Sequence, residues 1–283
     1  MREMNSTSTY ELDRYLKTAF EACDGASQIL NRYFGNLKNV DEKFQAGLVS
    51  EADKESEKLI VDLIRKSFPE HAILGEESGV SGQVDAGLRP ATGALWMIDP
   101  LDGTTNYVHR FPVFCISIGL EINGELVMGV VDAPKLGSRY HAVKGGGAFL
   151  NGERIHVSTR TKFRDGLFAT GFFETDNTLD EQLEFTYATI KNSRGIRRAG
   201  AAALDLCFVA EGIFDAFWEK NLSPWDTAAG VVIAREAGAI ATDMEGHDFN
   251  PRLKSVACGA PSQHQELLKL FRDVRSGRKP SRF

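Results

Sequence analysis

Residues 96–107 read WMIDPLDGTTNY, and this stretch decides how the rest of the chain is interpreted. The apolar run ALWMI predicts a buried strand that ends at Asp99, because Pro100 has no N–H to donate to a ladder. Asp102 follows one turn later, on the same side as Asp99. Two carboxylates this close repel each other unless one is protonated or a cation lies between them. Because Mg²⁺ prefers oxygen ligands, the pattern indicates a magnesium site.

Gly103, Thr104 and Thr105 come directly after this pair of acids. Small residues at the start of a helix leave backbone N–H groups free to bind a phosphate. The stretch therefore supplies metal ligands and an anion site within seven residues. The purely structural alternative is that both aspartates cap turns and the following helix. A helix start needs only one cap, so we favour the functional interpretation.

Three further acids stand at comparable places. Glu76 follows the apolar run AILG, again at the end of a predicted strand, and Asp226 in PWDTAAG stands at a predicted helix start. Asp53 lies three residues after Ser50, which is the spacing of a capping box. Helix capping alone would explain Asp53 and Asp226, so neither is decisive by itself. Together the acids form a candidate constellation for metal-assisted chemistry.

Hydrophobic periodicity predicts two sheets with helices between and outside them. The first half favours two helices followed by strands and hairpins, and the Asn-Gly pairs at 123–124 and 151–152 indicate hairpin turns. The second half alternates strand and helix. We expect an N-terminal part, 1–157, which carries the motifs, and a C-terminal part, 158–283, which completes one compact catalytic unit. The helices are expected at 10–34, after Ser50, and at 179–191, 201–211, 226–237 and 262–274. Hairpins are expected at 114–133 and 140–157, and single strands at 72–75, 94–99, 166–172, 195–198, 215–219, 239–244 and 255–260.

The bulk composition is that of an ordinary globular protein. The chain has 283 residues, of which 42% are hydrophobic and 25% charged, and its net charge of −6 gives it no general attraction to nucleic acid or anionic lipid. No apolar stretch approaches the ~20 residues of a membrane span, and the polar N-terminus lacks a signal-peptide core. The scattered cysteines fit neither a disulfide framework nor a zinc ribbon. We expect a cytoplasmic protein with buried free thiols at Cys23, Cys115, Cys207 and Cys258.

Five segments, taken in order, resemble the inositol monophosphatase family: LVSEAD, ILGEES, WMIDPLDGTTNYVHRFP, GIRRAGAAALDLCFVAEGIFDAFWE and PWDTAAG. The resemblance covers nearly the whole chain and is greatest to bacterial members. It implies a mixed α+β fold, the layered αβαβα sandwich of the inositol monophosphatase and fructose-1,6-bisphosphatase type, assembled as a homodimer. The implied activity is Mg²⁺-dependent hydrolysis of small phosphate monoesters, with inhibition by Li⁺.

The resemblance also implies a role for individual residues. Two or three Mg²⁺ ions are expected: a first at Glu76, Asp99 and the Leu101 carbonyl, a second at Asp99, Asp102 and Asp226, and a weaker third at Glu76, with Asp53 nearby through water. The matched catalytic residues are Glu76, Thr104 and Asp53. Lys43 matches a family lysine near a mobile loop. The matched substrate contacts are Asp102, Gly103, Thr104, Thr105, Ala202, Glu219 and Asp226.

The expected reaction is hydrolysis of myo-inositol monophosphate to inositol and phosphate by metal-activated water. A fructose-1,6-bisphosphatase or another sugar phosphatase of the same fold stays open as an alternative. A basic cluster could bind a second phosphate, although we slightly favour dimer contact or simple solvation as its explanation; its members are Arg194, Arg197 and Arg198.

An alternative of another class is a regulatory role in which the chain binds RNA or protein through its basic C-terminal tail. A solvated chain end is the plainer explanation of such a tail. Nucleic acid is otherwise not an expected partner, and a membrane is not expected at all. The tail carries Arg272, Arg275, Arg278, Lys279 and Arg282.

Overall fold

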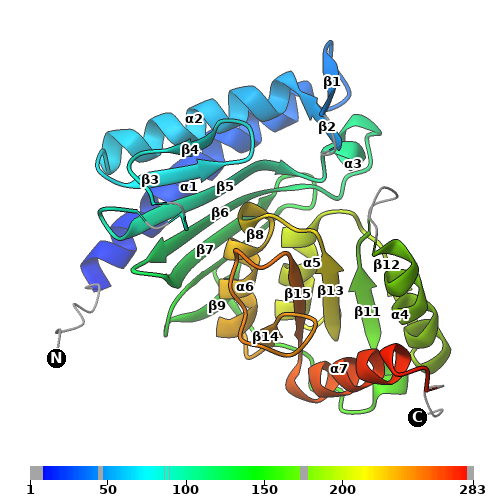
Figure 1. The fold of residues 1–283 in the computed structure, drawn as a ribbon. Helices are drawn as coiled ribbons and strands as arrows, with labels where there is room; N and C mark the ends of the chain where they lie inside the picture. The colour runs from blue at the N-terminus through cyan, green and yellow to red at the C-terminus, as the bar shows by residue number, and fades with distance from the viewer. Residues whose placement is uncertain (1–8, 44–46, 86, 89, 173–177, 279–283) are drawn as a thin grey trace, which may run out of the picture.

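Five layers build the molecule, in the order helix, sheet, helix, sheet, helix (Figure 1). The computed structural model describes residues 9–43, 47–85, 87–88, 90–172 and 178–278. The layered αβαβα sandwich expected from the sequence is confirmed. Within the described residues, no helix is long and apolar enough to cross a membrane.

The larger sheet has eight strands in the order β10-β9-β8-β7-β6-β5-β3-β4. Neighbouring strands are antiparallel except β3 and β5, which run parallel. Every residue of β5 is buried, because helices cover both faces of the sheet there. The strands are β3 (Ala72–Gly75), β4 (Gly79–Ser81), β5 (Ala94–Asp102), β6 (Cys115–Ile122), β7 (Glu125–Ala133), β8 (Ser138–Val143), β9 (Gly147–Leu150) and β10 (Glu153–Ile155).

The smaller sheet has five strands in the order β12-β11-β13-β15-β14. Strand β11 is parallel to both of its neighbours, and β15 is antiparallel to both of its own. These strands are β11 (Leu167–Thr170), β12 (Gly195–Arg197), β13 (Ala216–Lys220), β14 (Ile240–Thr242) and β15 (Ser255–Gly259). A separate antiparallel pair consists of β1 (Val40–Lys43) and β2 (Gly47–Ser50).

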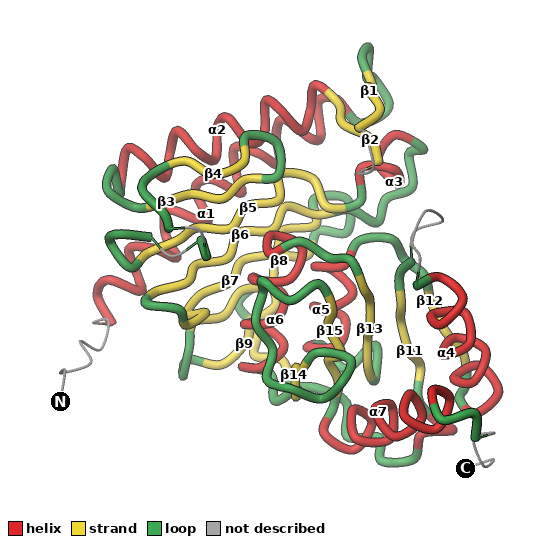
Figure 2. Tube along the Cα trace, in the orientation of Figure 1, coloured by secondary structure: helices red, strands yellow, loops and turns green. Residues whose placement is uncertain are grey.

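Helices form the outer and middle layers (Figure 2). The helices α1 (Thr9–Tyr33) and α2 (Glu51–Ser67) cover the outer face of the larger sheet. Between the sheets lie α5 (Ala202–Ala210) and α6 (Pro224–Glu236), and the far face of the smaller sheet is covered by α4 (Leu179–Asn192) and α7 (Pro261–Arg275). Two short helices, α3 (Thr104–Val108) and η1 (Phe163–Asp165), complete the described elements.

The middle layer packs very closely against the larger sheet. A Cβ atom at Gly129 of β7 would lie 2.3 Å from the carbonyl oxygen of Ala229 in α6. A Cβ atom at Gly119 of β6 would lie 2.7 Å from the Cβ of Ala228. Helix α6 is apolar around nearly its whole circumference after its first turn, as expected for a helix buried between two sheets.

An arginine clasp joins the larger sheet to the loop after β14. Arg252 donates to both carboxylate oxygens of Glu121 on β6, at 2.6 and 2.8 Å. The same guanidinium donates to the carbonyl oxygens of Gly87 and Leu88, at 3.0 and 3.1 Å. Glu121 is 1% exposed, so this pairing offsets the cost of burying its carboxylate.

Two local expectations need correction. Strand β5 does not end at Asp99 but continues to Asp102, and its register with β6 shifts between these residues. Pro100 interrupts the ladder as expected, but pairing resumes after it, which makes the irregularity a bulge. Helix α6 begins at Pro224, two residues earlier than expected, so Asp226 lies inside its first turn. The four cysteines are buried and free, as predicted.

Candidate active site

The predicted acids lie where several elements end close together. Asp99 is 2% and Asp102 9% exposed at the end of β5. The bulge turns the chain so that Asp99 Oδ1 accepts the N–H of Leu101 at 2.9 Å. Asp102 Oδ2 accepts the N–H of Ala203 at 2.8 Å, in the first turn of α5. Asp102 therefore connects the larger sheet to the middle helical layer.

Glu76 and Asp226 approach Asp99 from two different elements, the end of β3 and the first turn of α6. The N–H of Glu76 donates to the Ile98 carbonyl at 3.1 Å, just past the end of β3. Asp226 Oδ2 accepts the N–H of Ser223 at 2.7 Å, within a capping box. The carboxyl groups of both residues come within hydrogen-bonding reach of the Asp99 carboxyl group. The fold thus brings together the four predicted acidic ligands from β3, β5 and α6.

The electrostatics of this cluster favour a bound cation. Burial raises the pKa of Asp99 well above its usual range, and the charges of Glu76, Asp102 and Asp226 raise it further. Burial raises the pKa of Asp102 to about 7, although the Ala203 amide acts in the opposite direction. Burial and the charge of Asp102 raise the pKa of Asp226. A divalent cation would relieve this repulsion, because it stabilises the charged forms of all these acids.

The donor set fits Mg²⁺ in its chemistry, since every predicted ligand is an oxygen atom. Yet within the described ranges no group of three or more His, Cys, Asp or Glu side chains is placed so that it could hold a metal ion. The carboxyl group of Asp99 instead contacts those of Glu76 and Asp226 directly. The predicted ligand roles therefore stay predictions.

Asp53 and Thr104 form the second part of the site. The capping interpretation of Asp53 is confirmed, because its Oδ2 accepts the N–H of Ser50 at 2.8 Å within a capping box. Its Oδ1 lies 3.1 Å from the Thr104 hydroxyl, and its catalytic role stays a prediction. The hydroxyl also lies 3.1 Å from the carbonyl oxygen of Leu101. Asp53 is fully buried, and burial raises its pKa. The Asp53 carboxylate therefore lies within hydrogen-bonding distance of the Thr104 hydroxyl.

Gly103 shapes the predicted phosphate turn. It precedes α3 in the left-handed conformation, at φ 91°. A Cβ atom there would lie 3.1 Å from the carbonyl oxygen of Val113 and 3.2 Å from that of Gly200. Glycine is thus needed both for the backbone conformation and for space. Thr104 is partly buried and Thr105 exposed, so the turn faces the surface of the molecule.

The predicted substrate contacts on the C-terminal side lie against the same cluster. Ala202 opens α5 and is 7% exposed, and Glu219 at the end of β13 is also 7% exposed. Burial raises the pKa of Glu219 to about 8, and the charges of Asp226 and Asp102 add to the effect. A Cβ atom at Gly171 would lie 2.1 Å from Glu219 Oε2, so this glycine makes room for the carboxylate.

The basic residues do not form one free cluster. Arg194 is paired with Asp165 at 3.1 Å. Arg198 donates to the Phe172 carbonyl at 3.1 Å. Burial raises the pKa of Asp205 well above its usual range, and the charge of Arg198 offsets part of this rise. The side chain of Lys43 lies outside the described residues. A second-phosphate site therefore has less free positive charge than the sequence indicates.

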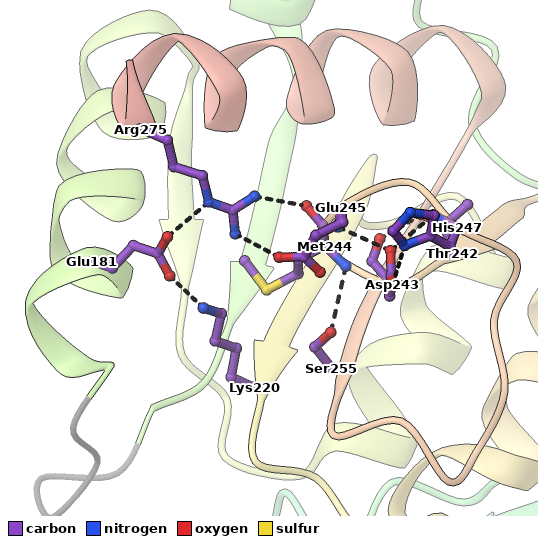
Figure 3. Close-up of polar contacts among 9 residues, drawn as sticks. All are labelled: Glu181, Lys220, Thr242, Asp243, Met244, Glu245, His247, Ser255 and Arg275. Carbon is purple, nitrogen blue, oxygen red and sulfur yellow. Dashed lines mark hydrogen bonds and ion pairs between the residues drawn. The ribbon is translucent and has the colours of Figure 1, made fainter. Parts of the chain in front are cut away.

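The basic tail is partly held in ion pairs as well. Arg275 donates to Glu181 of α4 at 2.7 Å and to Glu245 at 3.0 Å, and Glu181 also pairs with Lys220 of β13 (Figure 3). Arg278 pairs with Asp273 at 3.0 Å. These contacts fasten α7 to its neighbours. Lys279 and Arg282 lie outside the described residues.

Sequence reasoning missed three polar residues beside the site. Glu57 accepts two backbone N–H groups of the turn after Glu76. Asn106 donates to the carbonyl oxygens of Val113 and Ala199, which ties the phosphate turn to the segment before α5. Asp205 is 1% exposed within the apolar helix α5. Two sequence signals could have identified two of these residues. Asp205 is a charged residue within the apolar run ALDL, and Glu57 is an acid four residues after Asp53.

A sequence model of the inositol monophosphatase family matches residues 11–276. The chain belongs to the inositol monophosphatase family. The resemblance stated from the motifs is thereby confirmed, and with it the coarser functional prediction, a phosphatase of this family. The five sequence segments that carry the resemblance were sufficient to identify the family.

Curated relatives and solved structures agree with this membership. The chain is 41% identical to an inositol-1-monophosphatase of Synechocystis, over 92% of this chain and 89% of the relative. It is 42% identical to the Nus factor SuhB of Pseudomonas aeruginosa, over 83% and 87% of the two chains. The solved structure of the Thermotoga maritima IMPase superimposes with a TM-score of 0.84 at 35% identity, covering 93% of this chain and 98% of that one.

Proposed function

We propose that this protein is a Mg²⁺-dependent phosphatase that hydrolyses myo-inositol monophosphate to inositol and phosphate. The observation that carries the proposal is the convergence of Glu76, Asp99, Asp102 and Asp226. Burial and the neighbouring acids raise the pKa values of the three aspartates, and a bound cation would offset this effect. Membership of the family supports the same reaction. These four residues and the Leu101 carbonyl would hold two or three ions. When bound, Mg²⁺ supplies a water of lowered pKa and neutralises the charge of the phosphoryl group.

The chain's own groups would orient and deprotonate the attacking water. When the Thr104 hydroxyl donates to Asp53, its lone pairs can accept a hydrogen bond from that water. Asp53 and Glu76 are the carboxylates proposed to take up the proton. Backbone N–H groups of Gly103, Thr104 and Thr105 would hold the phosphate oxygens.

On the other side of the site, Ala202 and Glu219 would contact the ring of the substrate. A carboxylate accepts hydrogen bonds from vicinal hydroxyl groups, which suits a polyol. Glu219 is held between Gly171 and the acidic cluster, so its position is fixed before the substrate binds. This arrangement favours inositol or sugar phosphates over phosphate esters that lack neighbouring hydroxyl groups.

A phosphate-release panel tests the proposal. The purified chain is assayed on inositol 1-phosphate, fructose 1,6-bisphosphate and nucleotides, with Mg²⁺, with added Li⁺, and with EDTA. We expect release to require Mg²⁺, to fall with Li⁺ and to be fastest on inositol 1-phosphate. Faster release from fructose 1,6-bisphosphate would favour the sugar phosphatase alternative, and release unaffected by EDTA would overturn the metal mechanism.

A regulatory role is a second candidate, because several curated relatives carry Nus factor SuhB in their names. Binding of RNA through the basic tail would show as a salt-dependent mobility shift. The informative deletion removes residues 279–283, since Arg275 and Arg278 are engaged in ion pairs. A shift that survives this deletion, or no shift at low salt, would remove the tail from the proposal.

The remaining expectations concern assembly and location. The homodimer implied by the family stays a prediction, and sedimentation of the purified chain would test it. A cytoplasmic location is part of the same proposal, because free buried thiols suit a reducing compartment.

A further inference from the structure

Glu57 is a buried carboxylate to which the family resemblance gave no role. It lies on α2 and is 3% exposed. Its Oε2 accepts the backbone N–H of Glu77 at 2.8 Å, and its Oε1 accepts that of Ser78 at 2.7 Å. Hydrogen bonds from amides to a charged acceptor are stronger than neutral ones. The carboxylate therefore clamps the turn between β3 and β4, directly after Glu76.

This clamp fixes Glu76 from one side, while the sheet fixes it from the other. The backbone N–H of Glu76 donates to the Ile98 carbonyl at 3.1 Å. The turn that follows is tight, with Gly75 paired to Gly79. With both flanking segments held, the Glu76 side chain has little freedom except at its own rotatable bonds, and it points its carboxyl group at Asp99.

One face of α2 contacts both segments that carry predicted ligands. Asp53 bonds to Thr104, and Ser56 donates to the Pro100 carbonyl at 3.3 Å. Glu57 lies on the same face, four residues after Asp53, and reaches the turn after Glu76. Because a helix is rigid over one turn, these contacts fix the distance between the two ligand-bearing segments.

The strand leaves room for this carboxylate. A Cβ atom at Gly75 would lie 2.7 Å from Glu57 Cδ and Oε2 and 2.9 Å from Oε1. An alanine there would push the Glu57 side chain away without removing it. Gly75 does not have a left-handed backbone, so the substitution adds no backbone strain of its own.

We propose that Glu57 is a positioning residue that sets the affinity of the site for its divalent cation, by holding the turn that carries Glu76 against α2. The inference rests on the proposed function, which makes Glu76 a metal ligand. Glu57 itself is not expected to touch the ion or the substrate. Residues that orient metal ligands change metal affinity by roughly 10–100-fold when substituted.

The experiment compares Glu57→Gln with a matched control, Glu55→Gln. Glu55 lies on the same helix, but its carboxylate bonds to the side chains of Arg32 and Tyr33 at the surface. Calorimetric titration with Mg²⁺ alone gives the affinity without any turnover. We expect Glu57→Gln to weaken Mg²⁺ binding at least tenfold, and the control to bind like the wild type.

Kinetics separate positioning from a general structural role. In Glu57→Gln, the Mg²⁺ concentration for half-maximal phosphate release should rise by the same factor as the dissociation constant. The KM for inositol 1-phosphate should stay within about twofold, and kcat should recover at saturating Mg²⁺. A merely destabilised protein would instead lose kcat at every Mg²⁺ concentration.

Gly75→Ala provides an independent route if Glu57→Gln fails to fold. It should weaken Mg²⁺ binding in the same direction, and the double variant should be no worse than Glu57→Gln, since both act through one contact. Unchanged Mg²⁺ binding in Gly75→Ala and Glu57→Gln would overturn the proposal while leaving the phosphatase function intact. If Glu57→Gln weakens Mg²⁺ binding while the wild-type chain releases no phosphate, the positioning role of Glu57 is supported and the proposed phosphatase function is refuted. A wild-type chain that binds no Mg²⁺ would refute both.

Discussion

Replacement of Asp99 by Asn should have opposite effects on stability and on activity. The amide keeps nearly the same shape and can still accept the N–H of Leu101 through its oxygen. It removes an ionisable carboxyl group whose charged form is disfavoured on folding, since burial and three neighbouring acids raise the pKa of Asp99. It also removes the carboxylate that is expected to bridge two cations.

The size of the stability effect follows from the like charges. Two unit charges 4 Å apart repel by about 4 kcal/mol at an effective dielectric constant of 20. Shared protons relieve part of this repulsion without metal, so we expect a gain of about 1–2 kcal/mol in EDTA, or about 2–8 °C in melting temperature. In Mg²⁺ at 100 times its dissociation constant, the wild type gains about 2.7 kcal/mol, and the variant should lose that gain.

The assay is thermal unfolding in EDTA and in excess Mg²⁺, together with phosphate release. Turnover should fall about 10³-fold, which corresponds to about 4 kcal/mol of transition-state stabilisation. Asp215→Asn is the matched control, because Asp215 is also fully buried but is paired with Arg160 and accepts the N–H of Leu167. The Asp215→Asn substitution should lower the melting temperature in EDTA and leave the increase in melting temperature caused by Mg²⁺ unchanged.

Two results would refute this reasoning. If Asp99→Asn retains a tenth of wild-type phosphate release, then Asp99 does not bridge the catalytic cations. If Asp99→Asn melts below the wild type in EDTA, as Asp215→Asn is expected to do, then the acids of the site do not repel one another as described.

Two further predictions concern the framework around the site. Arg252→Ala should destabilise the fold by about 3 kcal/mol in denaturant titrations, because it leaves Glu121 buried without its cation. The double variant Arg252→Ala/Glu121→Leu should recover most of this loss, and equal instability of both variants would contradict the pairing argument. Gly129→Ala should cost about 1–3 kcal/mol or more, because the new Cβ meets the Ala229 backbone at 2.3 Å. An unchanged melting temperature would show that α6 can move away from the sheet.

The sequence predicted those parts of the fold that depend on local signals. The turns at Asn123-Gly124 and Asn151-Gly152 both have positive φ at each residue, which is the conformation that Asn-Gly pairs favour. The acids of the site could be found because each stands beside a local signal: the end of a strand, the Pro100 bulge of β5, or the first turn of a helix. Where several elements end close together, their side chains can converge on one site.

Contacts between distant segments escaped the same reasoning. The rule that Pro100 ends a ladder is local, and it says nothing about the pairing of Asp102 with Cys115 beyond the bulge. Glu57 looked like one more acid on a charged helix, because its partners are backbone groups twenty residues away. Arg275 looked like part of a solvated tail, because its partners on α4 and after β14 are adjacent only in the folded chain.

The position of α6 between the two sheets has a consequence for how the enzyme tolerates change. Asp226 lies in the first turn of α6. Close contacts of glycines on the larger sheet with alanines on this helix set the distance between the helix and the sheet. One added methyl group at this contact would shift Asp226 relative to the other predicted ligands, although the substituted residue is buried. We therefore expect catalytic activity to depend on the spacing between the two sheets, which the α6 contacts set.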